Sequence, residues 1–487
     1  MSIPEVASEQ ANLDPAPGRT GRSTRFRPVF MRLHFYAGIF VGPFLLIAAV
    51  TGGLYAIAPS IEQFVYHDYL HTDSVGELRP VADQIRAAQA RRPDLTVTAV
   101  RPATEPTDTT RVFFDDPTLG ISERLAVFID PVTATPQGEL TVYGSSGALP
   151  VRAWISQLHR SLHLGDPGRL YSELAASWLW LITLAGLFLW GTRYRRLSAR
   201  GDANAKLLAV DRSSRGRNRT LNWHGAVGIW IAAGLLFLSA TGLTWSLYAG
   251  TNITDLRAAL SWTTPTVSSA LENTGATAAV ASDHAGHEPG AAKAANTHTE
   301  PRVDDVDRVL HSARAAGIGG KVEVSIPAEA GTAFTVTQTR QPWVMSNNAV
   351  AVDGTTGTIT DTSWFADWPL AAKLSAWGIQ LHMGLLFGLV NQLVFLGLAA
   401  ALVTVIVHGY MLWWRRRPAR GGTPAGRPPR RGALTHLPLG AAVAVVAAAA
   451  AIGWFLPLFG LSLLAFVVVD ILVGMLQGRR ASAAKSR

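Results

Sequence analysis

The sequence predicts a membrane protein that is mainly an α-helical bundle with an internal duplication and two small extracytoplasmic α+β modules. Of its 487 residues, 48% are hydrophobic and only 16% are charged, a low charge content for a soluble protein. Apolar runs of about 20 residues, the length that crosses a bilayer, recur along the chain. The two halves of the chain also repeat the same residues in the same order.

The repeat has two constant differences in residue number. The first, which we call the short offset, relates His34, Gly38 and Thr51-Gly52 to His224, Gly228 and Thr241-Gly242. The second, the long offset, relates Asp130 and Gln157-Leu158-His159 to Asp353 and Gln380-Leu381-His382. Because the long offset exceeds the short one, the second copy carries an insertion between these two blocks.

The basic residues predict the orientation. Of the 43 lysines and arginines, 25 lie in four stretches, up to residue 32, at 193–219, at 415–431 and from 479 onward. Because basic residues flank membrane helices on the cytoplasmic side, we expect these stretches to be cytoplasmic. The formal net charge of +9 is then a topology signal, and we expect no nucleic-acid partner.

Together these features predict a multi-pass protein of the cytoplasmic (inner) membrane with both termini in the cytoplasm. The expected order is a basic N-terminus (1–33), a first membrane helix (34–58), a first outer module (59–151), an outer-edge helix and second membrane helix (152–191), a cytoplasmic loop (192–222), a third membrane helix (223–248), a second outer module (249–370), an outer-edge helix and fourth membrane helix (371–414), a cytoplasmic loop (415–436), a hairpin of two membrane helices (437–476) and a cytoplasmic tail (477–487).

Each outer module is expected to start with a helix and to continue with short strands. The first has a helical pattern over 81–91 and strand patterns at 111–114 and 125–130. The second has a helical pattern over 303–315 and strand patterns at 322–326, 334–337 and 349–353. In both, the last strand runs into a turn that begins with aspartate, Asp130-Pro131 and Asp353-Gly354.

In this order of motifs, the chain resembles the PepSY-associated transmembrane family, which includes iron-regulated membrane proteins and siderophore-iron reductases. The resemblance rests on a helix with His-x3-Gly, a strand ending in Asp before a turn, and Gln-Leu-His before a further helix, all present twice between about residues 28 and 417. It implies PepSY-like outer modules, b-type haem held by transmembrane histidines, and electron delivery to ferric iron outside the cytoplasm.

The histidines themselves also favour haem. With no cysteine in the chain, histidine is the only strong soft-to-borderline ligand in quantity, and a membrane-bound b-type haem takes two axial imidazoles. We expect two layers with three candidates each: His34, His224 and His408 near the cytoplasmic face, and His159, His163 and His382 near the outer face. Gly38 and Gly228, one helical turn after His34 and His224, are expected to pack against haem.

The pairing stays open at this point. Duplication favours equivalent pairs, but His163 and His408 have no histidine counterpart in the other copy, so an asymmetric arrangement is an alternative. His382 and His408 are expected to lie on one helix, about 39 Å apart. The opposing interpretation is that histidines at the membrane interface only anchor helices. Because four histidines occur at equivalent positions of the repeat, we consider this interpretation the weaker of the two.

Two other regions have simpler interpretations. The insertion at 264–300 has the composition of a disordered linker, with weak metal capture by His284, His287 and His298 as an option. Asp470, near the tail, is interpreted as a residue at the membrane edge without a function. The chain has no Gly-x-Gly-x-x-Gly fingerprint after a strand and no cytoplasmic segment long enough for a flavin or nicotinamide domain.

Together with the histidine pattern, the family resemblance thus implies a transmembrane ferric (siderophore) reductase for iron acquisition, with two haem b groups as its cofactors and no catalytic residue assigned. Electrons would come from a cytoplasmic reductase or from quinol and go to a ferric chelate or siderophore at the outer face. The alternatives are a non-redox accessory of metal or siderophore uptake and a PepSY-type regulatory or peptide-binding membrane protein.

Overall fold

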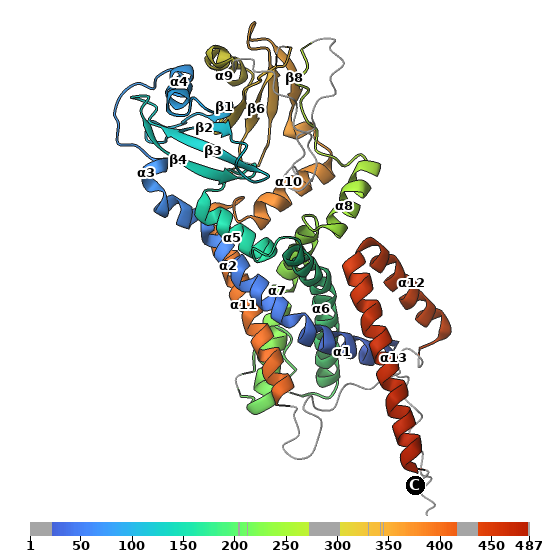
Figure 1. The fold of residues 1–487 in the computed structure, drawn as a ribbon. Helices are drawn as coiled ribbons and strands as arrows, with labels where there is room; N and C mark the ends of the chain where they lie inside the picture. The colour runs from blue at the N-terminus through green and yellow to red at the C-terminus, as the bar shows by residue number, and fades with distance from the viewer. Residues whose placement is uncertain are drawn as a thin grey trace, which may run out of the picture.

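The computed structural model describes residues 22–485 except 203–204, 212, 272–301, 330, 341, 344 and 416–436. It consists of a bundle of long helices with one β-sheet domain at one end (Figure 1). The element order repeats: a helix, four strands, a short helix and a long helix occur as α4–β1–β2–β3–β4–α5–α6 and again as α9–β5–β6–β7–β8–α10–α11.

Among the described residues, five helices are long and apolar enough to cross a membrane: α2 (Gly42–Val65), α6 (Asp166–Ser198), α7 (Gly216–Leu243), α11 (Gly388–Trp414) and the Pro457–Gln477 part of α13 (Pro457–Lys485). The chain is thus a multi-pass membrane protein. The fifth of the six expected spans forms a helix, α12 (Leu439–Phe455), but its 17 residues cover only about 25 Å. The prediction of six full-length spans is therefore not met at α12.

The first expected span is two helices, because α1 (Arg22–Phe40) ends before α2 begins. Pro43 has no N–H to donate to the carbonyl of Ile39, four residues earlier. The Tyr410 hydroxyl of α11 donates to that carbonyl instead, with an O···O distance of 2.7 Å. A Cβ at Gly42 would lie 2.9 Å from the same hydroxyl, so this position favours glycine. His34 consequently lies on α1, whereas Thr51-Gly52 lies on α2.

The strands of both halves form one antiparallel eight-stranded sheet in the order β4-β3-β2-β1-β5-β6-β7-β8. The strands are β1 (Thr96–Arg101), β2 (Thr110–Asp115), β3 (Glu123–Ile129), β4 (Pro136–Tyr143), β5 (Val322–Ser325), β6 (Phe334–Gln338), β7 (Ala349–Val352) and β8 (Ile359–Ser363). Two separate outer modules were expected; instead β1 pairs with β5, with Val100 opposite Val324. The sequence patterns also missed β1, β4 and β8.

The two faces of the sheet have different neighbours. Helices α4 (Val81–Arg91) and α9 (Val306–Ala315, preceded by the 3-10 turn Val303–Asp305) pack on one face over a core shared by both halves, which includes Ile85, Phe114, Val309 and Val336. Because side chains alternate along a strand, Arg111 and Phe113 of β2 face the other way, toward the helix bundle. Phe113 there packs with Phe128 and Leu149.

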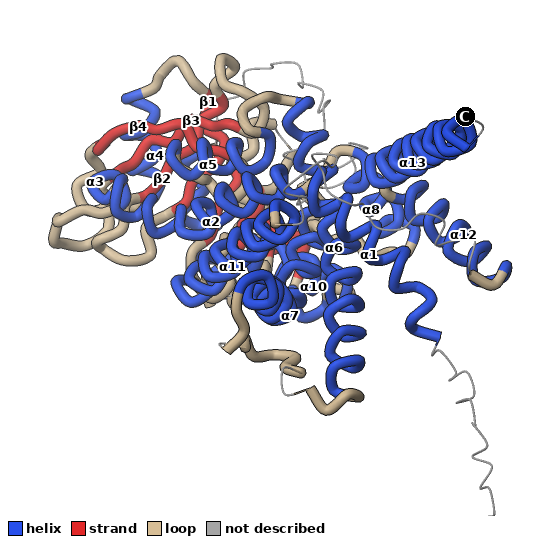
Figure 2. Tube along the Cα trace, turned by 90° about the horizontal axis from the view of Figure 1, so that it is seen from below, coloured by secondary structure: helices blue, strands red, loops and turns tan. Residues whose placement is uncertain are grey.

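The remaining elements connect the sheet to the bundle. They are α3 (His67–Leu70), α5 (Pro150–Ser161), α8 (Tyr248–Ala259), α10 (Leu370–His382) and a 3-10 turn (Phe365–Asp367). Helices α5 and α10 lie between the sheet and the long helices (Figure 1). Seen along the bundle, the long helices α2, α6, α7 and α11 group together, and α12 and α13 lie at the side (Figure 2).

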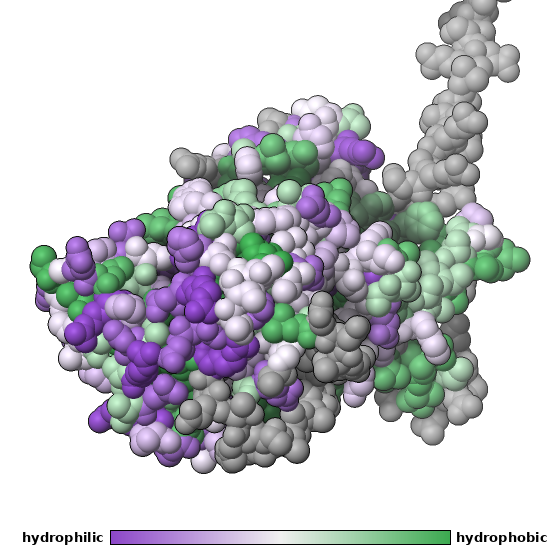
Figure 3. Space-filling model, turned by 90° about the horizontal axis from the view of Figure 1, so that it is seen from above, coloured by the Kyte–Doolittle hydropathy of each residue, from purple (hydrophilic) through white to green (hydrophobic). Residues whose placement is uncertain are grey.

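The hairpin α12–α13 joins the bundle through polar contacts. Asp470 of α13 forms an ion pair with Arg32 of α1, and the Ser462 hydroxyl accepts a hydrogen bond from Trp178 Nε1 of α6 at 2.8 Å. Asp470 therefore has a partner inside the protein, which the interpretation as a membrane-edge residue did not include. Hydrophobic side chains gather where α12 and α13 protrude, whereas hydrophilic ones gather over the sheet domain (Figure 3).

A three-membered ion cluster holds the two halves of the sheet together. Glu323 of β5 accepts hydrogen bonds from Arg101 Nε of β1 at 2.7 Å and from Arg124 Nη1 of β3 at 2.9 Å. Burial alone would raise the pKa of Glu323, but the two guanidinium groups lower it below its usual value. The cluster is largely buried, with 23% of the Glu323 side chain exposed.

We predict that Glu323→Gln lowers the free energy of unfolding by about 1–3 kcal/mol, between the values for surface and buried pairs, because two arginines lose their partner. The folded-state pKa lies below the unfolded value of about 4.3, so the carboxylate stabilises the fold above that pH and its contribution is lost as pH falls through the folded pKa. Thermal unfolding of the purified protein at pH 7 and pH 4 measures both effects.

Glu329→Gln is the matched control, since this glutamate is exposed on the loop after β5. Equal unfolding temperatures for the two variants at pH 7 would contradict the role of the cluster.

Candidate functional site

The histidines predicted as ligands lie at two levels of the helix bundle. His159 of α5 and His382 of α10 lie at the end next to the sheet. His34 of α1 and His224 near the start of α7 lie toward the opposite end, which we call the far level. Because Thr241, farther along α7, contacts His382, the two levels are about 25 Å apart along that helix.

At the far level, His34 and His224 form a close pair. Their ring centroids are 6.0 Å apart and the ring planes are inclined by 77°. His34 Nδ1 lies 3.0 Å from the carbonyl oxygen of Ile182 on α6, and His224 Nδ1 lies 2.9 Å from that of Val405 on α11. Because a carbonyl oxygen only accepts, each Nδ1 carries the proton, and each Nε2 keeps its lone pair for a ligand.

Glycines make room for both of these imidazoles. A Cβ on Gly186 would lie 3.1 Å from Cε1 of His34, and a Cβ on Gly409 would lie 3.5 Å from Cε1 of His224. The long offset of the repeat relates Ile182 to Val405 and Gly186 to Gly409. The repeat therefore includes the residues that orient the histidines.

At the level next to the sheet, threonines orient the histidines. His159 Nδ1 lies 3.0 Å from Oγ1 of Thr51, and His382 Nδ1 lies 2.6 Å from Oγ1 of Thr241. Each threonine hydroxyl donates its proton to the carbonyl four residues earlier, Ile47 at 2.8 Å and Phe237 at 2.7 Å. The threonine oxygen is then the acceptor for Nδ1–H, and Nε2 is again free to bind a ligand.

His159 and His382 line one cavity of about 610 Å³, which we call the histidine cavity. This volume lies within the range of about 300–1,000 Å³ typical of ligand and cofactor sites. Gly52 and Gly242 also line it, and a Cβ on Gly52 would lie 3.1 Å from the ring of His159. The deeper walls are apolar, with Leu235, Leu238, Leu398 and Leu402 among them.

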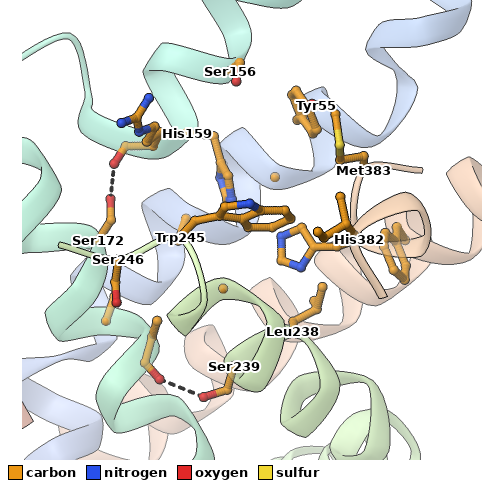
Figure 4. Close-up of a pocket in the computed structure, with 18 of the residues that line it drawn as sticks. Tyr55, Ser156, His159, Ser172, Leu238, Ser239, Trp245, Ser246, His382 and Met383 are labelled. Atoms are coloured by element: carbon orange, nitrogen blue, oxygen red, sulfur yellow. Dashed lines mark hydrogen bonds between the residues drawn. The ribbon is translucent and has the colours of Figure 1, made fainter. Parts of the chain in front are cut away.

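Two aromatic side chains, three residues after these glycines, accompany the histidines. Tyr55 is stacked near His159 with ring centroids 6.4 Å apart, and Trp245 is edge-on to His382 at 4.9 Å. The short offset of the repeat relates these two aromatic residues. In Figure 4, the indole of Trp245 lies beside both imidazoles within the cavity.

The mouth of the histidine cavity is cationic. Four arginines line the cavity, together with two glutamates: Arg124, Arg160, Arg169, Arg340, Glu173 and Glu323. Glu173 caps α8 by accepting from the backbone N–H groups of Tyr248 and Ala249. An anionic group on a bound molecule would therefore be attracted to the sheet side of this cavity.

The other predicted ligands have different surroundings. His163 has φ of 57° in the exposed turn after α5, contacts Trp154 and does not line the histidine cavity. His408 donates from Nδ1 to the Thr404 carbonyl at 2.7 Å and stacks on Trp223. It is not on one helix with His382, because the chain turns at Gly384 and Gly388, which have φ of 74° and 53°. The prediction that one continuous helix carries both histidines is therefore wrong.

Gly38 and Gly228 are open. A Cβ on either would meet no heavy atom of the described chain within 4 Å outside its own helix. Helix packing therefore does not require glycine there, and both leave space one turn beyond the far-level histidines. The linker histidines His284, His287 and His298 lie outside the described residues. Within the described residues, no three of His, Cys, Asp or Glu are arranged to hold one metal ion.

The sequence analysis identified the repeated Thr-Gly pairs but gave them no role, and it missed Tyr55, Trp245, Gly186 and Gly409. The repeat could have identified these residues, because the long offset relates Gly186 to Gly409 and the short offset relates Tyr55 to Trp245.

Comparison with known protein families identifies the family of this chain. The family described as the PepSY-associated TM region matches residues 31–416, which is most of the chain and includes both histidine levels. No curated protein matches the chain significantly.

We predict that Gly186→Val displaces His34 and lowers the free energy of unfolding by about 1–3 kcal/mol, as expected for overpacking. Gly397→Val is the control, since a Cβ on this α11 glycine meets nothing in the described structure within 4 Å. Thermal unfolding in detergent distinguishes them. Equal unfolding temperatures would show that His34 is not confined by Gly186.

Proposed function

This chain belongs to the PepSY-associated transmembrane family, and we propose that it is a membrane oxidoreductase that carries electrons through b-type haem to a ferric chelate on the sheet side. The observation that supports this most is the paired arrangement of imidazoles at two levels. In each pair, both Nδ1 atoms are held by hydrogen bonds to oxygens, so both Nε2 atoms are available. Bis-imidazole ligation of iron needs two such nitrogens.

The pair at the far level has a spacing that suits one metal ion between two rings. With metal–nitrogen bonds of about 2 Å, two imidazoles on opposite sides of an ion have centroids roughly 6 Å apart. The observed separation of His34 and His224 is 6.0 Å. The open surfaces beside Gly38 and Gly228 supply room for a flat group between the helices.

The histidine cavity suits the same cofactor in a second way. Its deeper part is apolar, which favours a porphyrin, and its cationic mouth favours the two propionate groups. In this proposal Arg160, Arg169 and Arg340 hold the propionates, while His159 and His382 bind the iron. When bound, the haem iron supplies one-electron redox chemistry, and the protein sets its ligands, spacing and access.

Trp245 has a defined part in this arrangement. Its indole lies beside His382 in the space that a macrocycle between the imidazoles needs. The residue belongs to the turn between α7 and α8, outside regular helix. If a haem occupied this space, the indole of Trp245 would have to move to admit it.

The charge distribution supports an orientation with the far level at the cytoplasmic face and the sheet outside. The protein would then sit in the cytoplasmic membrane and take electrons from a cytoplasmic reductase or from membrane quinol. The two offsets also relate the residues whose oxygens accept from the histidine Nδ1 atoms. This supports an origin by duplication of one PepSY-like unit. A non-redox role in metal or siderophore uptake, or a regulatory role, is the outcome if haem is absent.

We predict that replacing histidines by alanine removes haem one level at a time. His159→Ala or His382→Ala should remove the haem of the histidine cavity, and His34→Ala or His224→Ala that of the far level. Each variant should keep roughly half of the haem per protein, because the levels are separated by about 25 Å and share no ligand. Haem extraction and the reduced absorbance spectrum of purified protein measure this.

His163→Ala is the control and should keep the full haem content, since this residue is exposed. A colourless wild-type protein from haem-replete cells would refute the proposed cofactor, and full haem in any of the four variants would remove that residue from the ligand set.

The proposed activity has its own test. Protein reduced with dithionite should be reoxidised on rapid anaerobic mixing with a ferric chelate, and ferrous iron should form in a ratio of one per electron. Reoxidation no faster than in a chelate-free control would contradict the reductase proposal and favour an accessory role in uptake.

A further inference from the structure

A second cavity lies between the sheet and the sheet-side ends of α2 and α11. It has a volume of about 430 Å³, and its walls include Ser60 of α2 and Gln392 of α11. Four cationic side chains line it, Arg101, Arg111, Lys321 and Arg340, and among the described residues Asp108 is the only carboxylate in its lining. We call it the arginine cavity.

Arg101 and Lys321 have carboxylate partners. Arg101 is paired with Glu323, with an Nε···Oε2 distance of 2.7 Å, and also donates to the carbonyl oxygens of Ser145 and Ser146. Lys321 Nζ lies 2.8 Å from Oδ2 of Asp108. These two ion pairs neutralise part of the positive charge of the cavity.

Arg111 is different. Within the part of the chain that the structure describes, its guanidinium has no hydrogen bond and no carboxylate within ion-pair distance. It lies over the ring of Phe128, 5.5 Å from the centroid. Burial, and then the charge of Arg101, lower the pKa of Arg111 to about 10. A half-buried charge without a carboxylate partner is costly to the fold, so its presence calls for a ligand that balances it.

The position of the arginine cavity relates it to the histidine cavity. Ser146 and Arg340 line both cavities. Gly384, which lines the arginine cavity, follows His382 by two positions, and Met383 between them lines the histidine cavity. A molecule in the arginine cavity would therefore be separated from the sheet-side histidine pair by one layer of side chains.

We propose that Arg111 anchors a site for a carboxylate group of a small anionic ligand in the arginine cavity. This inference rests on the proposed function, in which the ligand is the ferric chelate. The chelate would be a polycarboxylate complex with a net negative charge. Arg111 has no carboxylate partner among the described residues, and Asp108, the only carboxylate in the described lining, is paired with Lys321, which disfavours neutral and cationic chelates. A haem held by His159 and His382 would supply one electron per chelate, and the chelated iron would change from ferric to ferrous.

The test uses gallium(III) citrate, which resembles the ferric complex in charge and does not accept an electron under these conditions. Isothermal titration calorimetry on the haem-loaded full chain should show binding that weakens with added salt. Arg111→Gln should lower the affinity about tenfold or more, because a hydrogen-bonded charge pair is lost. Arg111→Lys should lose less. Arg91→Gln, an exposed arginine of α4 on the other side of the sheet, should bind as the wild type does.

A second measurement keeps the test valid if binding is lost for structural reasons. Arg111→Gln removes a buried charge that lacks a carboxylate partner in the described structure, so its unfolding temperature should not fall below that of the wild type. Gallium citrate should raise the unfolding temperature of the wild type and not that of the variant. A less stable Arg111→Gln protein would show that Arg111 has a structural role and would overturn the proposal.

Three further outcomes would overturn it. Unchanged affinity in Arg111→Gln would remove Arg111 from the site. Loss of haem from this variant would show that Arg111 holds a propionate. Binding of phosphatidylglycerol in nanodiscs that is lost in Arg111→Gln, with no binding of gallium citrate to the lipid-free protein, would assign the site to a lipid headgroup. Because binding of gallium citrate needs no electron transfer, it can fail while haem reduction succeeds, and the two proposals are thus tested separately.

Discussion

Much of the helix arrangement depends on one constraint: each of four largely buried imidazoles needs an oxygen acceptor for Nδ1–H. Ile182 and Val405 supply carbonyls at the far level, and Thr51 and Thr241 supply hydroxyl oxygens near the sheet. Every acceptor belongs to a different helix from its histidine. The hydrogen bonds therefore fix how α1 meets α6, α7 meets α11, α5 meets α2 and α10 meets α7, because an unsatisfied N–H in an apolar bundle is costly.

Breaks in the helices are built around the same positions. Pro43 frees the carbonyl of Ile39, and Tyr410 of α11 satisfies it, so α1 can leave the axis of α2 while the backbone keeps its hydrogen bonds. The turn at Gly384 and Gly388 separates α10 from α11 and lets His382 approach Thr241. A straight helix through either point would place its histidine elsewhere. Irregular backbone thus occurs where it positions a ligand candidate.

Sequence reasoning succeeded where a signal was local. Helix 81–91 forms as predicted, and the aspartate turns form because Asp130 accepts from Val132 and Thr133 and Asp353 accepts from Thr355. It failed where the signal was long-range: nothing in the alternation of β1 or β5 indicates that they pair across the two halves. The register at that junction leaves Glu323 between Arg101 and Arg124, and only the folded sheet shows that these distant residues meet.

At the histidine site, too, some residues could be predicted from the sequence and others could not. Offsets in the sequence identified all four paired histidines. The one-turn spacing from His159 also admitted His163, because such spacing cannot reveal that the chain leaves the helix at Leu162 with φ of 52°. The arginine cavity had no sequence signal, since its cations come from separate segments of the chain. Arg111 illustrates the physical reason: a charge without a carboxylate partner cannot be recognised in a sequence, only from its surroundings in the described structure. Its cost to stability is the best argument that the cavity exists to bind an anion.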